Sequence, residues 1–463
     1  MRGLAREMRA CTWISVGPDA TATYTASVQL PHSLSRQDVI ALERAHVWPP
    51  YTSSERHETS EPLVIVRAQG AWIEDADGRR YLDGVSSWWT CTLGHDPQRL
   101  LRALREQAAD LIHVAAGGIT HAPIALLAKE LAEVAPQGLT RTHFSDDGST
   151  AVEVSVKIAF QYWQQNGRPK RHRFVALGGA YHGDTLGAAS LASIEEFSAV
   201  FGPLLFEIIR PPQDAPDWDH IVSALERELR SRPDEIAGVI IEPLIQGAAG
   251  MRMHPPEVLT RLREATHAID TFLIADEVFT GYGRTGRMFA CEHAGITPDL
   301  MCIAKGFTAG ILPMAATMAT ERVYSGFRGG AARALMHGHT FCGHPLGAAV
   351  AREVLAIYRD ESILDGVRSR AAEIERGFAK IAEIPGVVRV RSLGMVGAAD
   401  LGEGGYSGKR GERVYEAALR HGAYLRPLGD TVYITPPLNI PMDELASLLE
   451  IVEHSIRDAT AET

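Results

Sequence analysis

The most informative stretch of this chain is LMCIAKGFTAG, residues 300–310. An unbroken apolar run leads into Lys305, and a turn with two glycines follows, which is typical of a buried strand that ends at a site. Of the 46 basic residues only six are lysines. A lysine can lose its proton and form a Schiff base with a carbonyl, and burial lowers its pKa. Lys305 is therefore a candidate catalytic amine, with a lysine that merely snorkels from a strand end as the alternative.

Other short apolar runs share this pattern, and they occupy residues 141–145, 173–177, 238–242 and 272–276. Helical segments of about 10 to 15 residues separate the runs, which predicts a parallel sheet built by βαβ crossovers. Ligands bind beyond the carboxyl ends of such strands. We therefore expect Ser145, Glu242, Asp276 and Lys305 to converge on one crevice.

The 463 residues allow one large α/β domain and a smaller companion. Residues 1–34 are expected to be a loose extension, with an organelle transit peptide as the alternative. Residues 35–94 begin with a helical segment and continue as an antiparallel meander, and residues 346–463 mix helices with short strands. We expect these two segments to form a small α+β domain from both ends of the chain, and residues 95–345 to form the large domain around a mostly parallel sheet.

Composition argues against several classes of function, although a local basic patch stays possible. The net charge of −11 argues against nucleic acid as a partner. No segment approaches the roughly 20 apolar residues that span a bilayer, so we expect no membrane partner. The five cysteines have no spacing typical of a zinc or redox site, so we expect no metal and a cytoplasmic protein with reduced thiols.

The segment DDGST, residues 146–150, lies between a predicted strand and a predicted helix. The free N–H groups and the dipole of a helix N-terminus bind anions, and Gly148 and Ser149 would lie at that end, so a phosphate fits there. The alternative is a plain capping box, because Thr150 and Glu153 have the T-x-x-E spacing. Both interpretations can hold together.

Two further segments follow predicted strands. DEVFTGYGRTG, residues 276–286, is too rich in glycine for the body of a helix and begins with Asp276. A buried carboxylate there could keep a pyridine nitrogen protonated, although Asp276 could also simply cap the next segment. GGAYHGDT, residues 178–185, offers the ring of Tyr181 for stacking on a planar cofactor.

A phosphate cradle, an aromatic ring, a carboxylate and a lysine at successive strand ends are what pyridoxal 5′-phosphate (PLP) requires. From about residue 36 the chain resembles the class III aminotransferases, which have fold type I. The resemblance rests on DEV and GYGRTG in residues 276–286, then Pro298-Asp299, Lys305 and HTF at residues 339–341. It implies a PLP-dependent transaminase that works by ping-pong exchange through the pyridoxamine form of the cofactor.

In this family the matching residues have defined roles. The resemblance assigns the cofactor site to Gly148, Ser149, Tyr181, His182, Asp276, Val278, Lys305 and Thr340, and catalysis to Lys305, Asp276 and Tyr181. Lys305 would hold the cofactor as a Schiff base, Asp276 would pair with the ring nitrogen, and Tyr181 and Val278 would cover the two ring faces. Thr340 would reach the phosphate of a neighbouring subunit, which implies a homodimer.

Four further segments resemble the branch of this family that aminates 8-amino-7-oxononanoate (KAPA) to 7,8-diaminononanoate in biotin biosynthesis. They are residues 48–53, 86–90, 336–341 and 425–430. KAPA is a long aliphatic chain that ends in a carboxylate, so it needs an apolar tunnel with a cation at the far end. The resemblance assigns substrate binding to Tyr51, Trp88, Gly338 and Arg426, with Arg426 as the partner of the carboxylate.

Trp88 and Trp89 cannot be equivalent if they lie on a strand. Consecutive strand residues face opposite sides, so we expect Trp88 to reach the substrate and Trp89 to pack in the core. Arg426 precedes a proline and could alternatively be an exposed loop arginine.

The amino donor is expected to be S-adenosylmethionine, with lysine as the alternative. Trp88 favours S-adenosylmethionine, whereas His339 stands where the better-known users of that donor have proline. Gly338 also favours lysine, and residues 428–430 resemble relatives that take nitrogen from lysine. Glu242 resembles a gating glutamate of the family, without a defined role here.

Three other functions remain open on the sequence alone. One is another class III aminotransferase for ω-amino acids or diamines, and a second is a PLP aminomutase, which needs no separate donor. A third is a binding protein without catalysis, which the presence of Asp276 and Lys305 disfavours.

Overall fold

The computed structural model describes residues 34–211, 217–402, 405–406 and 408–461, and it divides into two compact units, Met1–Val66 and Arg67–Thr463. The expected loose extension lies outside the described residues, apart from Leu34. In the first unit, α1 (Arg36–His46) confirms the predicted helical segment, and α2 (Ser54–Thr59) follows it.

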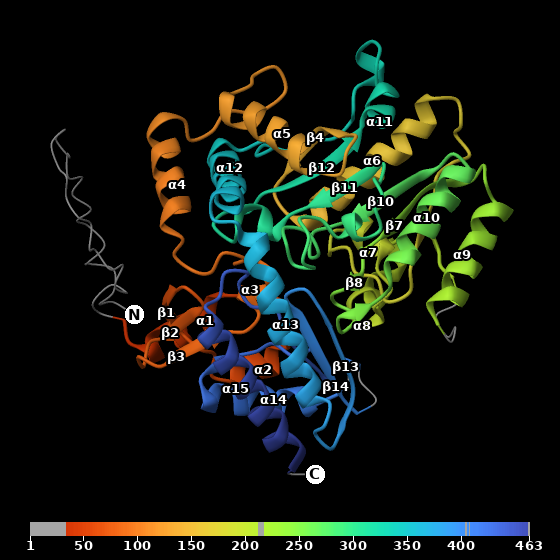
Figure 1. The fold of residues 1–463 in the computed structure, drawn as a ribbon. Coiled ribbons are helices and arrows are strands. Elements are labelled where there is room, and N and C mark those ends of the chain that lie inside the picture. The colour runs from red at the N-terminus through yellow and green to blue at the C-terminus, as the bar shows by residue number, and fades with distance from the viewer. Residues whose placement is uncertain (1–33, 212–216, 403–404, 407, 462–463) are drawn as a thin grey trace. The chain divides into compact units, whose positions relative to one another are not determined.

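A seven-stranded sheet forms the centre of the second unit (Figure 1). Its order is β4 (Leu139–Ser145), β12 (Ala315–Thr320), β11 (Leu300–Ile303), β10 (Phe272–Asp276), β7 (Ile236–Ile241), β5 (Arg173–Ala176) and β6 (Ile208–Ile209). Only β12 runs against the others among these strands. The mostly parallel sheet is thereby confirmed, and the predicted strands at its centre are all present.

Helices cover both faces of this sheet, because alternate residues of the buried strands point to opposite sides. On β7, Val239 and Ile241 pack with α9 (Trp218–Ser231) and α10 (Pro256–Ala268). Ile240, between them, packs on the other side with α6 (Gly148–Gln165). Figure 1 shows α9 and α10 side by side in green, with α6 in yellow. The strands therefore read as continuous apolar runs.

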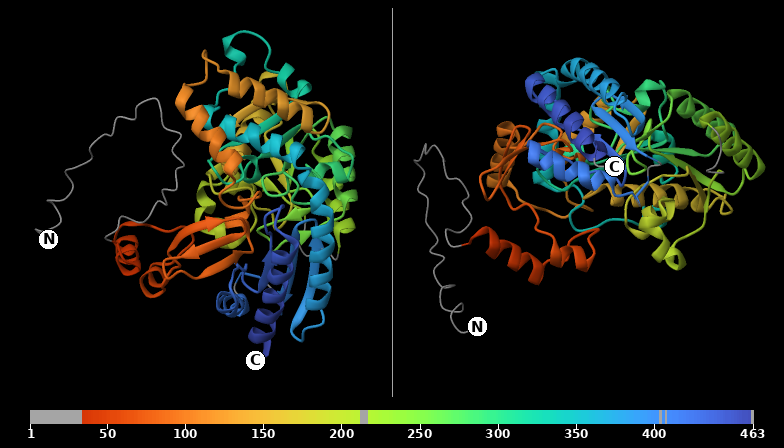
Figure 2. Two further views of the ribbon diagram at one scale, coloured as in Figure 1. Left: turned by 60° about the vertical axis from the view of Figure 1, so that its left-hand side comes forward. Right: turned by 90° about the horizontal axis from the view of Figure 1, so that it is seen from below.

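The smaller sheets join the beginning and the end of the second unit. Strand β15 (Ala423–Tyr424) pairs with β3 (Arg80–Asp83), which pairs with β2 (Trp72–Asp75) and then β1 (Ile65–Gln69). A second sheet contains β13 (Val387–Leu393), β14 (Val396–Leu401) and β16 (Thr431–Ile434), and helix α13 (Ile363–Ile381) packs on β13 and β14 (Figure 2). The predicted meander and C-terminal strands are confirmed.

The remaining elements connect these sheets. They are α3 (Ser86–Trp89), α4 (Gln98–Asp110), α5 (Ala122–Val134), α7 (Leu186–Leu191), α8 (Glu195–Ser198), β8 (Ile245–Gln246), β9 (Arg252–Met253), α11 (Glu321–Ser325), α12 (Pro345–Asp360), α14 (Arg410–His421) and α15 (Met442–Ala461), with short 3₁₀ turns between some of them. No helix in the described part of the chain is both long and apolar enough to cross a membrane. The predicted domain limits at residues 94/95 and 345/346 stay a prediction.

Candidate active site

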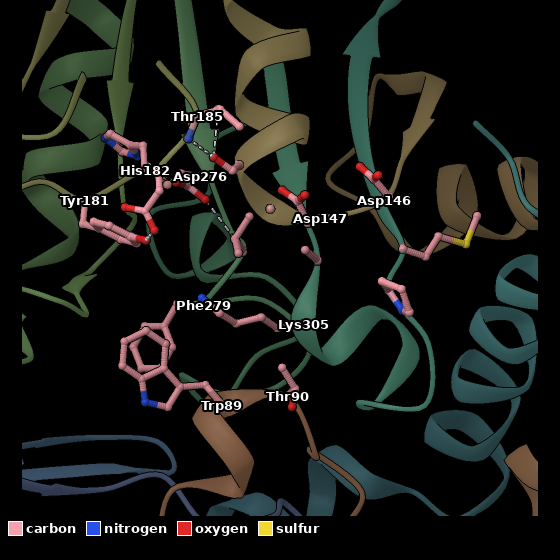
Figure 3. A pocket seen from close by; sticks show the side chains of 18 of the residues that line it. Trp89, Thr90, Asp146, Asp147, Tyr181, His182, Thr185, Asp276, Phe279 and Lys305 are labelled. Carbon is pink, nitrogen blue, oxygen red and sulfur yellow. Dashed lines mark hydrogen bonds and ion pairs between the residues drawn. The ribbon is translucent and has the colours of Figure 1, made fainter. Parts of the chain in front are cut away.

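A cavity of about 690 Å³ lies at the edge of the large sheet where the parallel strands end (Figure 3). Its lining includes seven residues that the sequence predicts for the site: Gly148, Ser149, Tyr181, His182, Asp276, Val278 and Lys305. Glu242 also lines the cavity. Ser145 ends β4 and is buried, but it is not part of the lining. The expected convergence of strand ends is therefore present for Glu242, Asp276 and Lys305.

Lys305 follows β11 and begins a short 3₁₀ turn with a left-handed φ of 49°. Its Nζ lies 4.7 Å from the ring centroid of Trp89 and 6.0 Å from that of Phe279 (Figure 3). Burial lowers the pKa of Lys305 to about 8, although nearby carboxylates oppose this change. A measurable fraction of the amine is therefore neutral near physiological pH, as a nucleophile or base requires.

Asp276 ends β10, and its carboxylate is fixed on both sides. Its Oδ2 lies 2.7 Å from Nδ1 of His182, and its Oδ1 accepts a hydrogen bond of 3.1 Å from the backbone N–H of Val278. The side chains of Asp276 and His182 are 6% and 0% exposed. A carboxylate held this firmly in the cavity wall can pair with a protonated ring nitrogen.

Ser149 lies in the first turn of α6 and faces Thr185. Its Oγ accepts a hydrogen bond of 3.0 Å from the backbone N–H of Thr185 and lies 2.9 Å from Oγ1 of that residue. A Cβ on Gly183 would lie 2.2 Å from Ser149 Oγ, and φ of Gly183 is +122°, so this approach requires glycine. The two hydroxyls and the helix N-terminus form one polar end of the cavity.

The predicted capping box of Thr150 and Glu153 is wrong. The N-cap is Asp147, whose side chain accepts from the N–H of Thr150, while the Thr150 hydroxyl accepts from the N–H of Asp147. Glu153 instead accepts hydrogen bonds of 2.7 and 3.1 Å from the N–H groups of Gly187 and Ala188 in α7. The T-x-x-E spacing could not reveal this, because α7 comes more than 30 residues later in the chain.

Glu242 fixes the backbone of Tyr181, whose ring lines the cavity. Its two carboxylate oxygens accept hydrogen bonds from the N–H of Tyr181 at 3.0 Å and of Gly247 at 2.9 Å. Burial raises the pKa of Glu242 to about 7. The hydroxyl of Tyr181 donates to Asp184 Oδ2 at 2.8 Å, so the ring is held at both ends.

Trp88 and Trp89 do not lie on a strand, so the expectation that they alternate as strand residues is wrong. Residues Ser86–Trp89 form a turn in which φ is 48°, 46°, 64° and 74° in order, all left-handed. This conformation costs non-glycine residues about 1–2 kcal/mol each. Trp89 lines the cavity and also donates a hydrogen bond of 3.2 Å to the hydroxyl of Tyr433, so it serves both the cavity and the core. The ring of Trp88 lies 3.9 Å from the guanidinium of Arg426.

The structure does not bring all of the predicted residues to the cavity. Trp88 and Arg426 contact one another but are not part of its lining. Gly338 and Thr340 lie in an exposed loop. Tyr51 belongs to the first unit. The substrate roles of these residues stay predictions.

The lining residues that sequence reasoning missed as site residues include Thr185, Phe279 and Trp89. Thr185 immediately precedes α7, so a hydroxyl at a helix start was its available signal. Phe279 follows Val278 in the segment DEVFTGYGRTG, but whether its side chain points into the cavity depends on the fold of the loop. Glu277 fixes that loop by accepting from Thr280 Oγ1 and from the N–H groups of Ala290 and Cys291.

These residues fit PLP. The Ser149 end offers donors to a phosphate, Asp276 offers a carboxylate to the ring nitrogen, and Lys305 offers an amine to the aldehyde. A Cβ on Gly148 would lie 2.6 Å from the side chain of Val278. Glycine at this position therefore lets the N-terminus of α6, which would hold the phosphate, lie close to Val278, which would contact the ring of the cofactor. Among the described residues, His182 Nε2 is a buried polar atom without a hydrogen-bond partner.

Comparison with known proteins agrees with this geometry. The chain is 42% identical over 439 residues to the adenosylmethionine-8-amino-7-oxononanoate aminotransferase of Geobacter sulfurreducens, covering 90% of this chain and 97% of the relative. It is 43% identical over 414 residues to the protein of the same name from Synechococcus elongatus, covering 87% of this chain and 96% of the relative.

Solved structures show the same fold. The protein of that name from Methanocaldococcus jannaschii has a TM-score of 0.88 at 32% identity, with 92% of this chain and 99% of the other chain covered. An amine transaminase from an uncultivated Pseudomonas species, solved in its PLP-bound form, has a TM-score of 0.85 at 32% identity, with 89% and 98% covered. The fold is therefore fold type I, and the cofactor is PLP.

The family comparison covers most of the chain. Residues 53–456 match the family described as aminotransferase class-III. Together with the amine, the carboxylate and the polar end of the cavity, this match shows that the chain belongs to the class III aminotransferases and is a PLP-dependent transaminase.

Proposed function

We propose that this enzyme transfers an amino group to KAPA and forms 7,8-diaminononanoate, a step of biotin biosynthesis. One observation carries the proposal. A single turn, Ser86–Trp89, places the ring of Trp89 against Nζ of Lys305 and the ring of Trp88 against the guanidinium of Arg426. A long aliphatic ketone with a terminal carboxylate needs this order of amine, aromatic wall and cation. The names of the relatives above support the same acceptor.

PLP, when bound, supplies an aldehyde that takes up amines and a protonated ring that stabilises a carbanion. Lys305 would act as the base, because its lowered pKa of about 8 leaves part of the amine neutral. Its Nζ would accept the proton from the amine-bearing carbon of the donor and later return a proton to the former carbonyl carbon of the acceptor. Asp276, fixed by His182, would keep the ring nitrogen protonated.

The other side chains would orient the reactants. Ser149 and Thr185 would hold the phosphate, and Tyr181 and Val278 would enclose the ring. Trp89 and Phe279 exclude water around the amine, which strengthens its interaction with Asp276. Arg426 would bind the acceptor carboxylate while its guanidinium stays on the face of Trp88.

The proposed donor is S-adenosylmethionine, which the names of the relatives support. Lysine is the alternative, because His339 precedes Thr340 in this chain. His339 Nε2 lies 3.5 Å from Asp146 Oδ1, so this histidine lies beside the phosphate-binding turn.

We also propose a homodimer with shared sites. Thr340 is exposed and does not line the cavity of its own chain, so it is available to a second subunit. Its neighbour Phe341 is 53% exposed, and the ring centroid of His113 lies 5.1 Å from that of Phe341. The adjacent Ile112 is 63% exposed, which adds apolar surface for an interface.

We also propose a cytoplasmic location, which suits the free thiols of Cys291 and Cys302.

Purified holoenzyme tests this proposal directly. KAPA is supplied with S-adenosylmethionine or with lysine in parallel, and diaminononanoate is quantified by mass spectrometry. We expect product with one of the two donors. Absence of product with both, together with turnover of β-alanine or a diamine, would instead identify an ω-amino acid or diamine transaminase.

A further inference from the structure

The turn Ser86–Trp89 is strained and must be held by its surroundings. Four consecutive non-glycine residues have left-handed φ values between 46° and 74°. Such conformations persist where neighbouring groups determine them, and they cluster at functional sites. Here the turn carries the two rings that contact Lys305 and Arg426.

Asp83 holds this turn by hydrogen bonds. It ends β3, and its side chain is 0% exposed. Its Oδ2 accepts hydrogen bonds from the backbone N–H of Ser87 at 2.6 Å and from Ser87 Oγ at 2.9 Å. Its Oδ1 accepts from the N–H of Val85 at 3.2 Å. One carboxylate therefore binds the residue before the strained turn and the second residue of the turn.

His95 fixes this carboxylate. Its Nε2 lies 3.0 Å from Asp83 Oδ2, and its side chain is 12% exposed. The backbone of His95 is itself tied to Gly70, with N···O distances of 2.7 and 3.0 Å. Burial alone would lower the pKa of His95, but Asp83 and the nearby Cys91 raise it to about 10. A charged imidazole therefore compensates the buried carboxylate at working pH.

We propose that Asp83 and His95 are positioning residues, which hold the turn Ser86–Trp89 so that Trp89 faces Lys305 and Trp88 faces Arg426. Neither residue lines the cavity. The pair thereby sets the affinity of the enzyme for its long-chain acceptor through Trp88 and Arg426, and it acts on Lys305 only indirectly, through the position of Trp89. This inference rests on the proposed function.

The first test compares two histidine variants. His95→Gln keeps an N–H donor but removes the charge. His421→Gln is the control, because His421 Nε2 also lies 3.0 Å from an aspartate Oδ2, that of Asp458, but this pair is on the surface. We expect His95→Gln to raise KM for KAPA about tenfold with kcat within about threefold. The cofactor absorbance and the control should match the wild type.

A second readout does not depend on the substrate. Hydrogen–deuterium exchange of the holoenzyme should quicken in residues 84–93 of His95→Gln and remain unchanged elsewhere. Glycine adopts left-handed φ without strain. The comparison is between His95→Gln/Ser87→Gly and His95→Gln/Ser87→Ala, because both double variants lose the Ser87 hydroxyl but only glycine relieves the backbone strain. The glycine double variant should have the lower KM for KAPA, which a general loss of stability would not produce.

The outcomes separate the inference from the proposed function. Wild-type enzyme that does not aminate KAPA contradicts the proposed function. Wild-type enzyme that does so, with His95→Gln showing the wild-type KM and the wild-type exchange of residues 84–93, overturns the positioning role. If His95→Gln yields no folded holoenzyme, Ser87→Ala replaces it, because it removes only one hydroxyl of an exposed residue. An unchanged KM for KAPA in Ser87→Ala would then overturn the proposal.

Discussion

The amine of Lys305 rests on the face of Trp89, with Nζ 4.7 Å from the ring centroid. An aromatic face attracts a cation, but it does not replace the water that burial removes. The pKa of Lys305 accordingly falls to about 8. The same apolar surroundings that favour a neutral, reactive amine must therefore destabilise the apoprotein while the amine is charged.

Replacement of Lys305 by Met should stabilise the apoprotein. Below about pH 8 the lysine is charged in the folded and unfolded states, and the folded state bears the full cost of burying that charge. The gain should be at most about 3 kcal/mol at pH 7. It should shrink as the pH rises from about 8 toward the ordinary pKa of 10.5, because the unfolded lysine then also loses its proton. Urea denaturation of both apoproteins at pH 7 and pH 10 measures this difference, and an equal gain at both values would contradict the lowered pKa.

Asp276→Asn should retain the cofactor but lose activity. The amide keeps the shape beside His182 but cannot stabilise a protonated ring nitrogen by charge. We expect kcat to fall at least about a hundredfold. The matched control is Asp458→Asn, since Asp458 also pairs with a histidine but on the surface. Wild-type kcat in Asp276→Asn, measured with saturating substrates, would refute the role of Asp276.

Arg426→Met should weaken binding of the acceptor carboxylate. Hydrogen bonds to a charged group contribute about 1.5–3 kcal/mol, so KM for KAPA should rise roughly ten- to a hundredfold. The methyl ester of KAPA carries no carboxylate and serves as the control substrate. Its KM should be similar in the wild type and in Arg426→Met. If KM rises equally for acid and ester, Arg426 acts on the packing of Trp88 rather than on the carboxylate.

Thr185→Val should weaken the binding of PLP. It removes the hydroxyl that lies 2.9 Å from Ser149 Oγ but keeps the backbone N–H that also binds this atom. We expect the Kd for PLP to rise about tenfold, with less effect on a cofactor analogue that lacks the phosphate. Fluorescence titration of the apoproteins gives both constants. An unchanged Kd for PLP would exclude Thr185 from the phosphate site.

The centre of the sheet could be predicted from the sequence, because strands buried on both faces are continuous apolar runs. Residues 272–276 and 300–305 show this pattern and end at Asp276 and Lys305. Strand β12 was missed, since AATMAT has three alanines, which are depleted in strands, and it pairs antiparallel with both neighbours.

The turn that carries Trp88 and Trp89 could not be predicted, for a physical reason. Its left-handed backbone depends on hydrogen bonds to Asp83, and Asp83 in turn depends on His95. The residue preferences of SSWW do not favour that conformation. Such a turn becomes visible only when the contacts around it are known.

The covalent attachment site of the cofactor tests the central claim most directly. Borohydride reduction of the holoenzyme fixes PLP to the lysine that holds it, and peptide mass spectrometry then locates the phosphopyridoxyl group among the six lysines of the chain. We predict that Lys305 alone is modified and that Lys305→Arg leaves no modified lysine. A label on any of the other five lysines, with Lys305 unmodified, would contradict the account.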